Sequence, residues 1–269
     1  MRLRVFASGS KGNALAVRST GGQLLLVDLG LSCLDLTKRA KACDVDVGEA
    51  SGVLFTHDHS DHYKGVATFH KRHPEVPLYA NGDTADAIAV QTGVADGWAV
   101  FETAVDFDLG DFHVTPFSTS HDAADPVGFL LEDVSAGLAV SPALFVGTDT
   151  GIVTTGFREA FRRCDLAVLE SNHDPVLLET SDRPAPLKQR IAGRSGHLSN
   201  DDAADLFRAA NPPRLQTLLL AHLSEQCNST HLARAAMEAA FRECGRKDIR
   251  LDILAQHEPS DLFVCPTAR

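Results

Sequence analysis

Aromatic residues are scarce in this sequence: Phe, Trp and Tyr make up 6% of its 269 residues. The core must therefore be filled by Val, Leu, Ala and Ile, a composition typical of layered α/β proteins. Long apolar runs are missing as well, since none approaches the roughly 20 residues needed to cross a bilayer. The apolar start of the chain breaks at once into the turn SGSKG at residues 8–12, so no export signal is recognised. We expect a cytoplasmic protein that does not bind membranes.

Closely spaced cysteine pairs are also absent. The six cysteines are spread over the chain with no CxxC motif, which predicts free, buried thiols. Basic residues are outnumbered, because 25 Lys and Arg stand against 36 Asp and Glu for a net charge of -11. This balance argues against a broad basic surface for nucleic acid but allows a local one. The 44% hydrophobic content excludes disorder and fibrous repeats.

Extended apolar segments alternate with helix-like ones, and no linker rich in Pro, Gly or Ser interrupts them. We therefore predict a single domain over residues 1–269. The patterns predict strands over 3–7, 14–18, 24–28, 52–56, 76–80, 99–106, 112–117, 127–131, 143–147, 166–171, 215–221 and 249–254. They predict helices over 34–43, 63–73, 84–91, 155–163, 200–210 and 229–244. About a dozen strands with mixed connections favour two packed sheets with helices outside.

The segment HDHSDH at residues 57–62 follows a predicted buried strand. Four of its side chains are potential metal ligands: His57, His59, Asp61 and His62. A strand that ends in a loop can direct several side chains at one centre, and imidazole and carboxylate groups bind divalent metals. A solvated loop would leave these groups crowded together with nothing to hold them. The spacing therefore predicts a compact site for two divalent ions.

Two metal ions need about seven ligands, so others must come from further along the chain. His and Asp residues at strand ends are the natural candidates. Three meet this criterion: His121 after the strand at 112–117, Asp149 after the strand at 143–147, and His222 after the strand at 215–221. Their order after the HDHSDH segment leads us to expect that they complete the site.

The order of these motifs resembles the metallo-β-lactamase superfamily, and most closely its phosphodiester-hydrolysing branch. Further blocks resemble the bacterial YycJ/WalJ-type hydrolases, which are related to the ribonuclease Z enzymes: FASGS at 6–10, GTDTG at 147–151, ESNHD at 170–174, LKQRI at 187–191 and GHLSN at 196–200. The similarity extends from Val5 to about Thr230. It implies an α/β fold of the four-layer αβ/βα sandwich type, with the site at one edge of the two sheets.

By this resemblance, the ligands form two sets that share one carboxylate. One ion binds His57, His59 and His121, the other binds Asp61, His62 and His222, and Asp149 bridges both. Such a pair can lower the pKa of a shared water molecule toward neutrality, which supplies a nucleophile. A His/Asp ligand set without cysteine accepts zinc, manganese or iron, so the sequence leaves the metal open.

Two more residues resemble the pair that assists departure of the leaving group in the ribonuclease Z enzymes. They are His197, before a predicted helix, and Glu170, near the end of the strand at 166–171. An imidazolium held by a carboxylate can protonate the leaving oxygen, a step that metals alone assist less well. The catalytic candidates are therefore Asp61, Asp149, Glu170 and His197.

A local reversal of charge precedes His197. Residues 183–194 include four basic residues and no acidic one, which fits a phosphate clamp or, equally well, a solvated helix face. The candidate substrate contacts are Lys188, Arg190, Arg194, His173 and Ser199. For His173, a supporting position behind the metal ligands is an equal alternative.

The resemblance implies a metal-dependent phosphodiesterase, and more narrowly a DNA exonuclease with a role in DNA repair. The tRNA-processing endonucleases carry a long substrate arm, and the span between His121 and Asp149 is too short to contain one. Recognition of the substrate should therefore depend on the surface of the core. Ester, thioester and lactone hydrolases share the same ligand series, which makes a small-molecule hydrolase the alternative. A third interpretation is a regulatory protein in which the ions only stabilise the fold.

Overall fold

The structure is a computed structural model that describes residues 1–137, 139 and 141–265. The strands of the first sheet, in spatial order, are β14 (Phe263–Val264), β1 (Arg2–Ala7), β2 (Ala14–Arg18), β3 (Leu24–Val27), β4 (Gly52–Leu54), β5 (Leu78–Asn81) and β6 (Trp98–Phe101). Those of the second are β13 (Arg250–Ile253), β12 (Thr217–Ala221), β11 (Leu166–Glu170), β10 (Ala143–Gly147), β9 (Val127–Asp133), β8 (Phe112–Ser118) and β7 (Phe107–Leu109).

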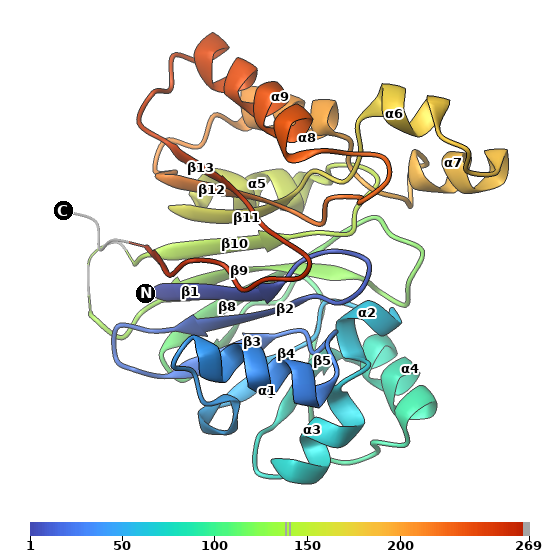
Figure 1. Ribbon diagram of the computed structural model, residues 1–269. Coiled ribbons are helices and arrows are strands. Elements are labelled where there is room, and N and C mark those ends of the chain that lie inside the picture. The colour runs from blue at the N-terminus through green and yellow to red at the C-terminus, as the bar shows by residue number, and fades with distance from the viewer. Residues whose placement is uncertain (138, 140, 266–269) are drawn as a thin grey trace.

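The helices lie on the outer faces of these two sheets. They are α1 (Cys33–Ala42), α2 (Ser60–Tyr63), α3 (Val66–Arg72), α4 (Gly82–Thr92), α5 (Thr155–Arg163), α6 (Pro175–Thr180), α7 (Ala185–Ile191), α8 (Asn200–Ala210) and α9 (Thr230–Glu243), with a 3₁₀ turn at Val47–Glu49. In Figure 1, α1 and α3 cover the first sheet, and α5, α8 and α9 cover the second. The layers are those of the expected αβ/βα sandwich. Within the described residues, no helix combines the length and apolarity needed to cross a bilayer.

Apolar side chains fill three layers of core, one between the sheets and one beneath the helices of each half. Strand β3 illustrates the arrangement, because all four of its residues are apolar and buried. Leu25 and Val27 pack in the cluster between the sheets, and Leu24 and Leu26 pack beneath the helices. Alternation along a strand with both faces covered accounts for this continuous apolar run.

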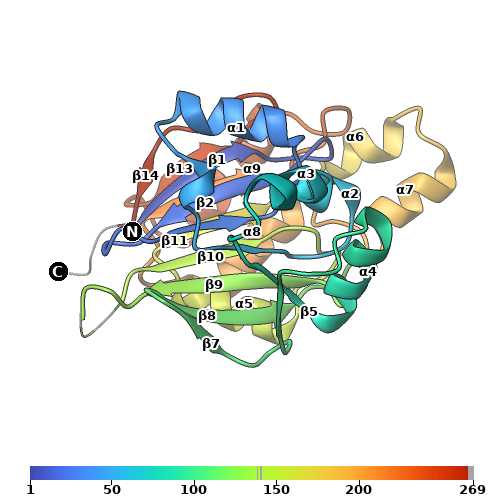
Figure 2. The same cartoon turned by 90° about the horizontal axis from the view of Figure 1, so that it is seen from below.

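The parallel strands of each sheet determine where a site can form. Strands β3 to β6 run parallel in the first sheet, and β10 to β13 do so in the second. Their carboxyl ends therefore lie at the same edge, where ligands of open α/β sheets generally bind. In Figures 1 and 2, helices α6 and α7 stand out from the body of the molecule, on the side where α2 and α4 also lie.

The helix predicted over 63–73 is confirmed only over Val66–Arg72, as α3, and its predicted start is wrong because Tyr63 ends the separate helix α2. The chain turns between them at Gly65, whose amide donates a hydrogen bond to the carbonyl of Leu29 at 2.9 Å. A Cβ at Gly65 would collide with the carbonyl of Leu31, so only glycine allows this close approach.

The strand predicted over 99–106 is confirmed only as far as Phe101. Strand β6 ends there, and the chain then crosses to the second sheet, where β7 begins at Phe107. The β-branched residues Thr103 and Val105 continue the strand-like pattern and so hide this change of sheet. Helices α6 and α7 and strand β14 were not predicted either. The six cysteines are free as expected, although Cys43 and Cys244 are only half-buried.

Asp133 links the two sheets at the edge opposite the ends of β4 and β10. Its carboxylate accepts hydrogen bonds from Thr20, in the turn between β2 and β3, through the amide and the hydroxyl, both at 2.7 Å. It also accepts one from the hydroxyl of Ser135 at 2.6 Å. Burial opposes ionisation, but the hydrogen bonds from Ser135 and Thr20 outweigh it and lower the pKa of Asp133 below its usual value.

Replacing Asp133 by asparagine should therefore lower the free energy of unfolding by about 1–3 kcal/mol at neutral pH. A carboxyl whose pKa is lower in the folded state stabilises the fold above its unfolded pKa, and this stabilisation is lost as the pH falls through the folded value. The stability difference should hold down to about pH 5 and narrow below about pH 4. Urea denaturation across this range, with the exposed Asp44→Asn as control, measures it. A difference that persisted undiminished at pH 2 would contradict the assignment.

Candidate metal centre

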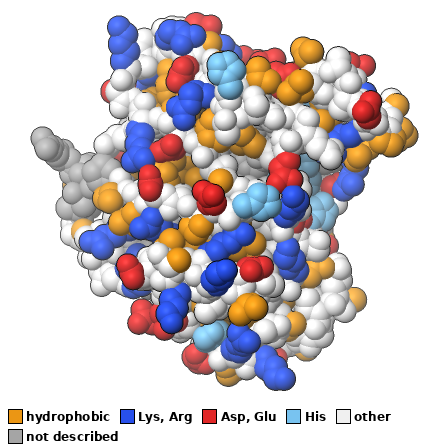
Figure 3. Space-filling view, in the orientation of Figure 1, with side chains coloured by type: hydrophobic (Ala, Val, Ile, Leu, Met, Phe, Trp, Pro, Cys, Tyr) orange, Lys and Arg blue, Asp and Glu red, His pale blue; other side chains and the backbone are white. Residues whose placement is uncertain are grey.

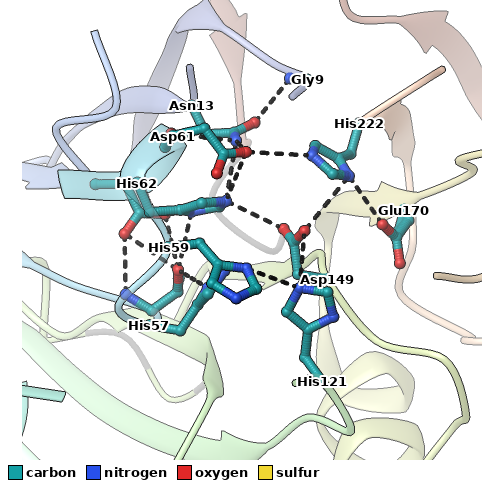
Figure 4. A network of polar contacts seen from close by, with 12 residues as sticks. Gly9, Asn13, His57, His59, Asp61, His62, His121, Asp149, Glu170 and His222 are labelled. Atoms are coloured by element: carbon teal, nitrogen blue, oxygen red, sulfur yellow. Dashed lines mark hydrogen bonds and ion pairs between the residues drawn. The ribbon is translucent and has the colours of Figure 1, made fainter. Parts of the chain in front are cut away.

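The predicted ligands converge at the edge formed by the strand ends. His57 and His59 follow β4, and Asp61 and His62 lie on α2, so these four come from the first half of the molecule. The other three ligands follow strands of the second sheet: His121 after β8, Asp149 after β10 and His222 after β12. Figure 4 shows the carboxylate of Asp149 among these imidazoles. The site therefore joins the two halves of the sandwich.

The ligand atoms form four groups, and within each group all of the atoms lie within 4.8 Å of one another. One group contains His57, His59 and His121, and another contains Asp61, His62 and His222. Asp149 belongs to two further groups that overlap these, one with His57 and His62 and one that includes His222. Its Oδ2 lies 3.3 Å from Nε2 of His62, and its Oδ1 lies 3.8 Å from Nε2 of His121. This placement suits a carboxylate shared by two ions.

Unsatisfied buried atoms provide a test of whether the site fits metal ions. Nε2 of His57, Oδ2 of Asp149 and Nε2 of His222 are buried and have no hydrogen-bond partner in the described part of the chain. A buried polar atom without a partner costs free energy, and so such atoms are rare. Three of them in one cluster are accounted for if a bound cation satisfies them. The residues present therefore fit a dinuclear metal site.

Each of the five imidazoles is held through one nitrogen by a hydrogen-bonding group outside the ligand set. Four of them are held at Nδ1. Two contact carboxylates: His62 lies 2.7 Å from Oδ2 of Asp28, and His222 lies 3.0 Å from Oε1 of Glu170. The other two contact a hydroxyl and a carbonyl: His57 lies 3.0 Å from Oγ1 of Thr56, and His121 donates to the carbonyl of Gly196 at 3.0 Å. His59 is held through Nε2, which donates to the carbonyl of Asp122 at 3.2 Å. Anchoring the second nitrogen in this way is typical of metal-binding histidines.

Three residues of the site adopt a backbone conformation that side chains rarely take. Asp28, Asp149 and His222 have φ values of 60°, 57° and 55°. Each comes at or just after the end of a strand: β3, β10 and β12, respectively. The left-handed region costs free energy for residues other than glycine, and such strain is concentrated at functional sites. Here it turns the side chains of three strands toward one point.

The electrostatic field of the site favours positive charge. Burial opposes the imidazolium charge of His222, but Asp149 and Asp61 outweigh it and raise the pKa of His222 to about 10. The pKa of His62 is also well above its usual value, because Asp28 and Asp149 outweigh the effect of burial. The same carboxylates would stabilise a divalent cation bound there.

Glu170 and His197 lie beside these ligands, as the sequence predicted. Nδ1 of His197 is 2.8 Å from Oε1 of Glu170 and 3.6 Å from Oδ1 of Asp149. Burial opposes the charge on Glu170, but His197 and His222 outweigh it and lower the pKa of Glu170 to about 2. Glu170 is fully buried, and its Oε2 accepts hydrogen bonds from the amides of Thr150 and Leu198. It is therefore a fixed carboxylate that orients His197.

A cavity of about 210 Å³ opens over the centre and is bounded on one side by α7. In the space-filling view, histidine side chains appear at the right-hand edge between the two halves, with acidic and basic side chains beside them (Figure 3). Of the predicted substrate contacts, Arg190 lines this cavity, and its Nε donates to Oδ2 of Asp122 at 2.7 Å. His197 also lines it, with a side chain that is one-fifth exposed.

The other predicted substrate contacts lie outside the lining of the cavity. The hydroxyl of Ser199 caps α8 through Asp202, so it is committed to the helix end. Nζ of Lys188 donates to the carbonyl of Glu179, and the exposed Arg194 lies beyond the helix. His173 is buried, and its backbone pairs with that of Ser199 behind the cavity wall. This position matches the supporting alternative for His173.

Sequence reasoning missed Asp28 as a member of the site. Its carboxylate accepts hydrogen bonds from the amide and hydroxyl of Thr56, at 2.9 Å in each case, and contacts Nδ1 of His62. The sequence did contain a signal, because Asp28 comes at the end of a buried strand, as Asp149 does. Applying the strand-end criterion to the first three strands would have found it.

Replacing Asp28 by asparagine should weaken metal binding about 10- to 100-fold, because His62 loses the carboxylate that orients its ring. Asparagine tolerates the positive φ at this position, so the backbone should be retained. Equilibrium dialysis with metal analysis measures the affinity. The matched control is Asp44→Asn, an exposed position with a φ of 56°, which should bind metal as the wild type does. Equal affinities for the two variants would show that Asp28 does not orient His62.

Comparison with known proteins agrees with this geometry. Residues 25–222 match the beta-lactamase superfamily domain. The chain is 34% identical over 247 residues to exodeoxyribonuclease YycJ of Bacillus anthracis, covering 91% of this chain and 90% of that protein. It is 33% identical over 239 residues to exodeoxyribonuclease WalJ of Streptococcus pneumoniae, covering 87% and 85% of the two chains.

Solved structures of low sequence identity share the fold. The metallo-beta-lactamase fold protein YhfI from Bacillus subtilis has a TM-score of 0.67 at 19% identity, covering 97% of this chain and 99% of that one. Human tRNase Z, short form, has a TM-score of 0.66 at 16% identity, covering 99% and 100%. The family match, the relatives and the His/Asp cluster agree: this chain is a metallo-hydrolase of the metallo-β-lactamase superfamily, homologous to the YycJ and WalJ exodeoxyribonucleases.

Proposed function

We propose that this protein is a DNA exonuclease that hydrolyses phosphodiester bonds with two divalent metal ions. The observation that carries the proposal is the similarity to two proteins named exodeoxyribonucleases, which extends over most of both chains. The pairing of Glu170 with His197 beside the His/Asp cluster supports it, because departure of an alcohol from phosphorus needs a proton donor. We also propose that residues 1–269 act as one domain, since both halves contribute ligands.

In this proposal the ligands are divided as the sequence suggested. His57, His59 and His121 would hold one ion, Asp61, His62 and His222 would hold the other, and Asp149 would be shared between them. When bound, the ions supply Lewis acidity toward the phosphate oxygens and a water molecule of lowered pKa. Zinc, manganese and iron all suit a set of imidazoles and carboxylates, and reconstitution with each would identify the active one.

The chain's own residues provide the proton and the orientation. Glu170 holds Nδ1 of His197, which leaves Nε2 available to donate a proton to the departing oxygen. The amide of His197 donates to the carbonyl of Ile191 at 2.9 Å, which ties this catalytic residue to the end of α7. Arg190 is the predicted contact that we retain for substrate in the cavity. We assign no contact there to Lys188, Arg194, Ser199 or His173.

Digestion of end-labelled single- and double-stranded DNA and RNA by the metal-reconstituted protein tests the proposal. Asp149→Asn serves as the blank. Stepwise shortening of DNA from one end, absent in the blank, is the expected result and gives the polarity of cleavage. Hydrolysis of esters, thioesters or lactones without any cleavage of nucleic acid would refute the nuclease. Inactivity on every substrate, with metal-dependent melting retained, would instead favour the regulatory interpretation.

We further propose that the exonuclease acts in DNA repair, as the resemblance to its relatives suggested. A strain that lacks the gene should be sensitive to DNA damage, and the wild-type gene should restore resistance. Restoration by the inactive Asp149→Asn variant would contradict a role that depends on catalysis.

A further inference from the structure

Helices α6 and α7 form an arm beside the cavity that has little contact with the core. Helix α7 has no buried residue, and the exposed side chains of α6 include Val176, which is 67% exposed. Both views of the ribbon show the arm standing out from the body (Figures 1 and 2). The arm therefore contributes little to the core, and its side chains are available for contacts at the cavity.

One face of the arm is directed at the cavity. Leu187, Arg190 and Ile191 all line it, and their spacing of three and four residues places them on the same side of α7. Arg183, four residues before Leu187, lines it as well. Lys188 lies on a different side and is absent from the lining. The arm therefore presents two arginines and two aliphatic side chains to whatever enters the cavity.

The two arginines differ in whether a carboxylate of the protein neutralises their charge. Arg190 forms an ion pair with Asp122, whose Oδ1 lies 3.6 Å from Nε2 of His121, so its charge is balanced within the protein. Arg183 forms no ion pair with any described residue, and its buried Nε has no hydrogen-bond partner among them. An unsatisfied buried donor is costly unless a ligand completes it. Arg183 is thus a cation in the cavity wall that is available to a ligand.

The shape of the guanidinium group indicates the ligand. The two terminal nitrogens of an arginine together match two oxygens of a phosphate. An unpaired cation in the cavity wall adds positive charge beside the metal centre and so attracts an anionic substrate. Leu187 and Ile191 add a half-buried apolar surface on which the flat face of a base can rest. Phosphate and apolar contacts side by side suit a nucleotide unit.

We propose that Arg183 binds a second phosphate of the substrate, the one next to the phosphate that is cleaved, while Leu187 and Ile191 support the intervening nucleoside. This inference depends on the proposed nuclease function and narrows the range of substrates expected for it. The preferred substrate is a strand with at least two successive phosphodiester linkages rather than an isolated phosphodiester. The backbone link between Ile191 and His197 places the bound nucleotide in fixed relation to the proton donor.

The test compares Arg183→Ala with the wild type on two substrates. For a single-stranded oligodeoxynucleotide, kcat/KM should fall about 10- to 100-fold, mainly through KM, because a charge-assisted contact is lost. For bis-p-nitrophenyl phosphate, which has no second phosphate, kcat/KM should change by less than about twofold. Lys188→Ala is the matched control: it removes a cation from the same basic segment but outside the cavity lining, and this variant should cleave both substrates as the wild type does.

A chemical change in the DNA identifies the phosphate. Replacing the linkage next to the scissile one by a neutral methylphosphonate should slow the wild type as much as Arg183→Ala does, and should slow that variant no further. Binding of a labelled oligonucleotide in the presence of a chelator provides a readout without catalysis. There, the slope of log K against log salt should decrease by about one in Arg183→Ala.

The outcomes separate this inference from the proposed function. If the wild type cleaves DNA and Arg183→Ala cleaves it equally well, the inference is wrong and the nuclease function stands. If Arg183→Ala loses activity equally on DNA and on bis-p-nitrophenyl phosphate, Arg183 shapes the site instead of binding a second phosphate, and the inference is again wrong. If the wild type cleaves no nucleic acid, the proposed function and this inference both fail.

Discussion

Replacing Asp149 by asparagine should reduce nuclease activity at least about a thousandfold, which corresponds to the several kcal/mol that metal ions supply to the transition state. The carboxylate of Asp149 lies within 3.8 Å of ring nitrogens of His62, His121 and His222. Neutralising it removes the one ligand that both ions would share. The bound metal should therefore fall from about two ions per chain to one or fewer.

Asparagine is the informative replacement at this position. The backbone of Asp149 has a φ of 57°, which asparagine tolerates better than alanine does. Its amide is nearly isosteric with the carboxylate, so the buried volume is preserved. Metal analysis, DNA digestion and thermal melting at saturating metal would be measured on one preparation. Asp44→Asn, with a similar φ, controls for the backbone. Two bound ions and full activity in Asp149→Asn would refute the shared-ligand assignment.

Replacing His197 by alanine should slow DNA cleavage about 100- to 1,000-fold and leave the metal content unchanged. The reason is that His197 contacts Glu170 at 2.8 Å and is positioned to protonate the departing oxygen. A p-nitrophenolate leaves without a proton, so hydrolysis of bis-p-nitrophenyl phosphate should fall less than about tenfold. The variant should therefore depend more steeply on the pKa of the leaving group than the wild type does.

This difference between substrates distinguishes proton donation from a structural role. A merely structural histidine would affect both substrates to the same extent, and an equal loss would refute the assignment. His231→Ala, on the exposed side of α9, should leave both rates unchanged. Glu170→Gln should show the same substrate difference as His197→Ala, together with a lower melting temperature, because Glu170 is buried and accepts several hydrogen bonds.

The ligand set could be predicted because the topology of the fold determines where the strand ends lie. In a sandwich with parallel strands, carboxyl ends gather at one edge, so His or Asp after a buried apolar run can be assigned without knowing the loops. The same rule applies to Asp28, but it was read only as the end of a strand. Its role depends on a contact with His62, 34 residues away, that no local pattern shows.

The substrate-binding residues were harder to predict because they depend on which side of a short helix faces the cavity. The basic segment was visible in the sequence, but which of its side chains face the cavity is decided by how α7 lies against the site. Only Arg190 and Arg183 line it, whereas Lys188 and Arg194 do not. Similarly, the chain changes sheet after Phe101 because of how the two halves pack against each other. The local sequence pattern carries no information about that packing.

The sandwich is held by polar contacts at two opposite ends. Asp133 joins the second sheet to the turn at Thr20 through hydrogen bonds. At the opposite end, the amide of His222 donates to the hydroxyl of Ser8 at 2.8 Å, and the amide of Val127 donates to the carbonyl of Thr56 at 2.9 Å. These contacts hold the two halves of the site together without bound ions. The ligands are therefore preorganised, and metal binding requires little free energy to bring the halves together.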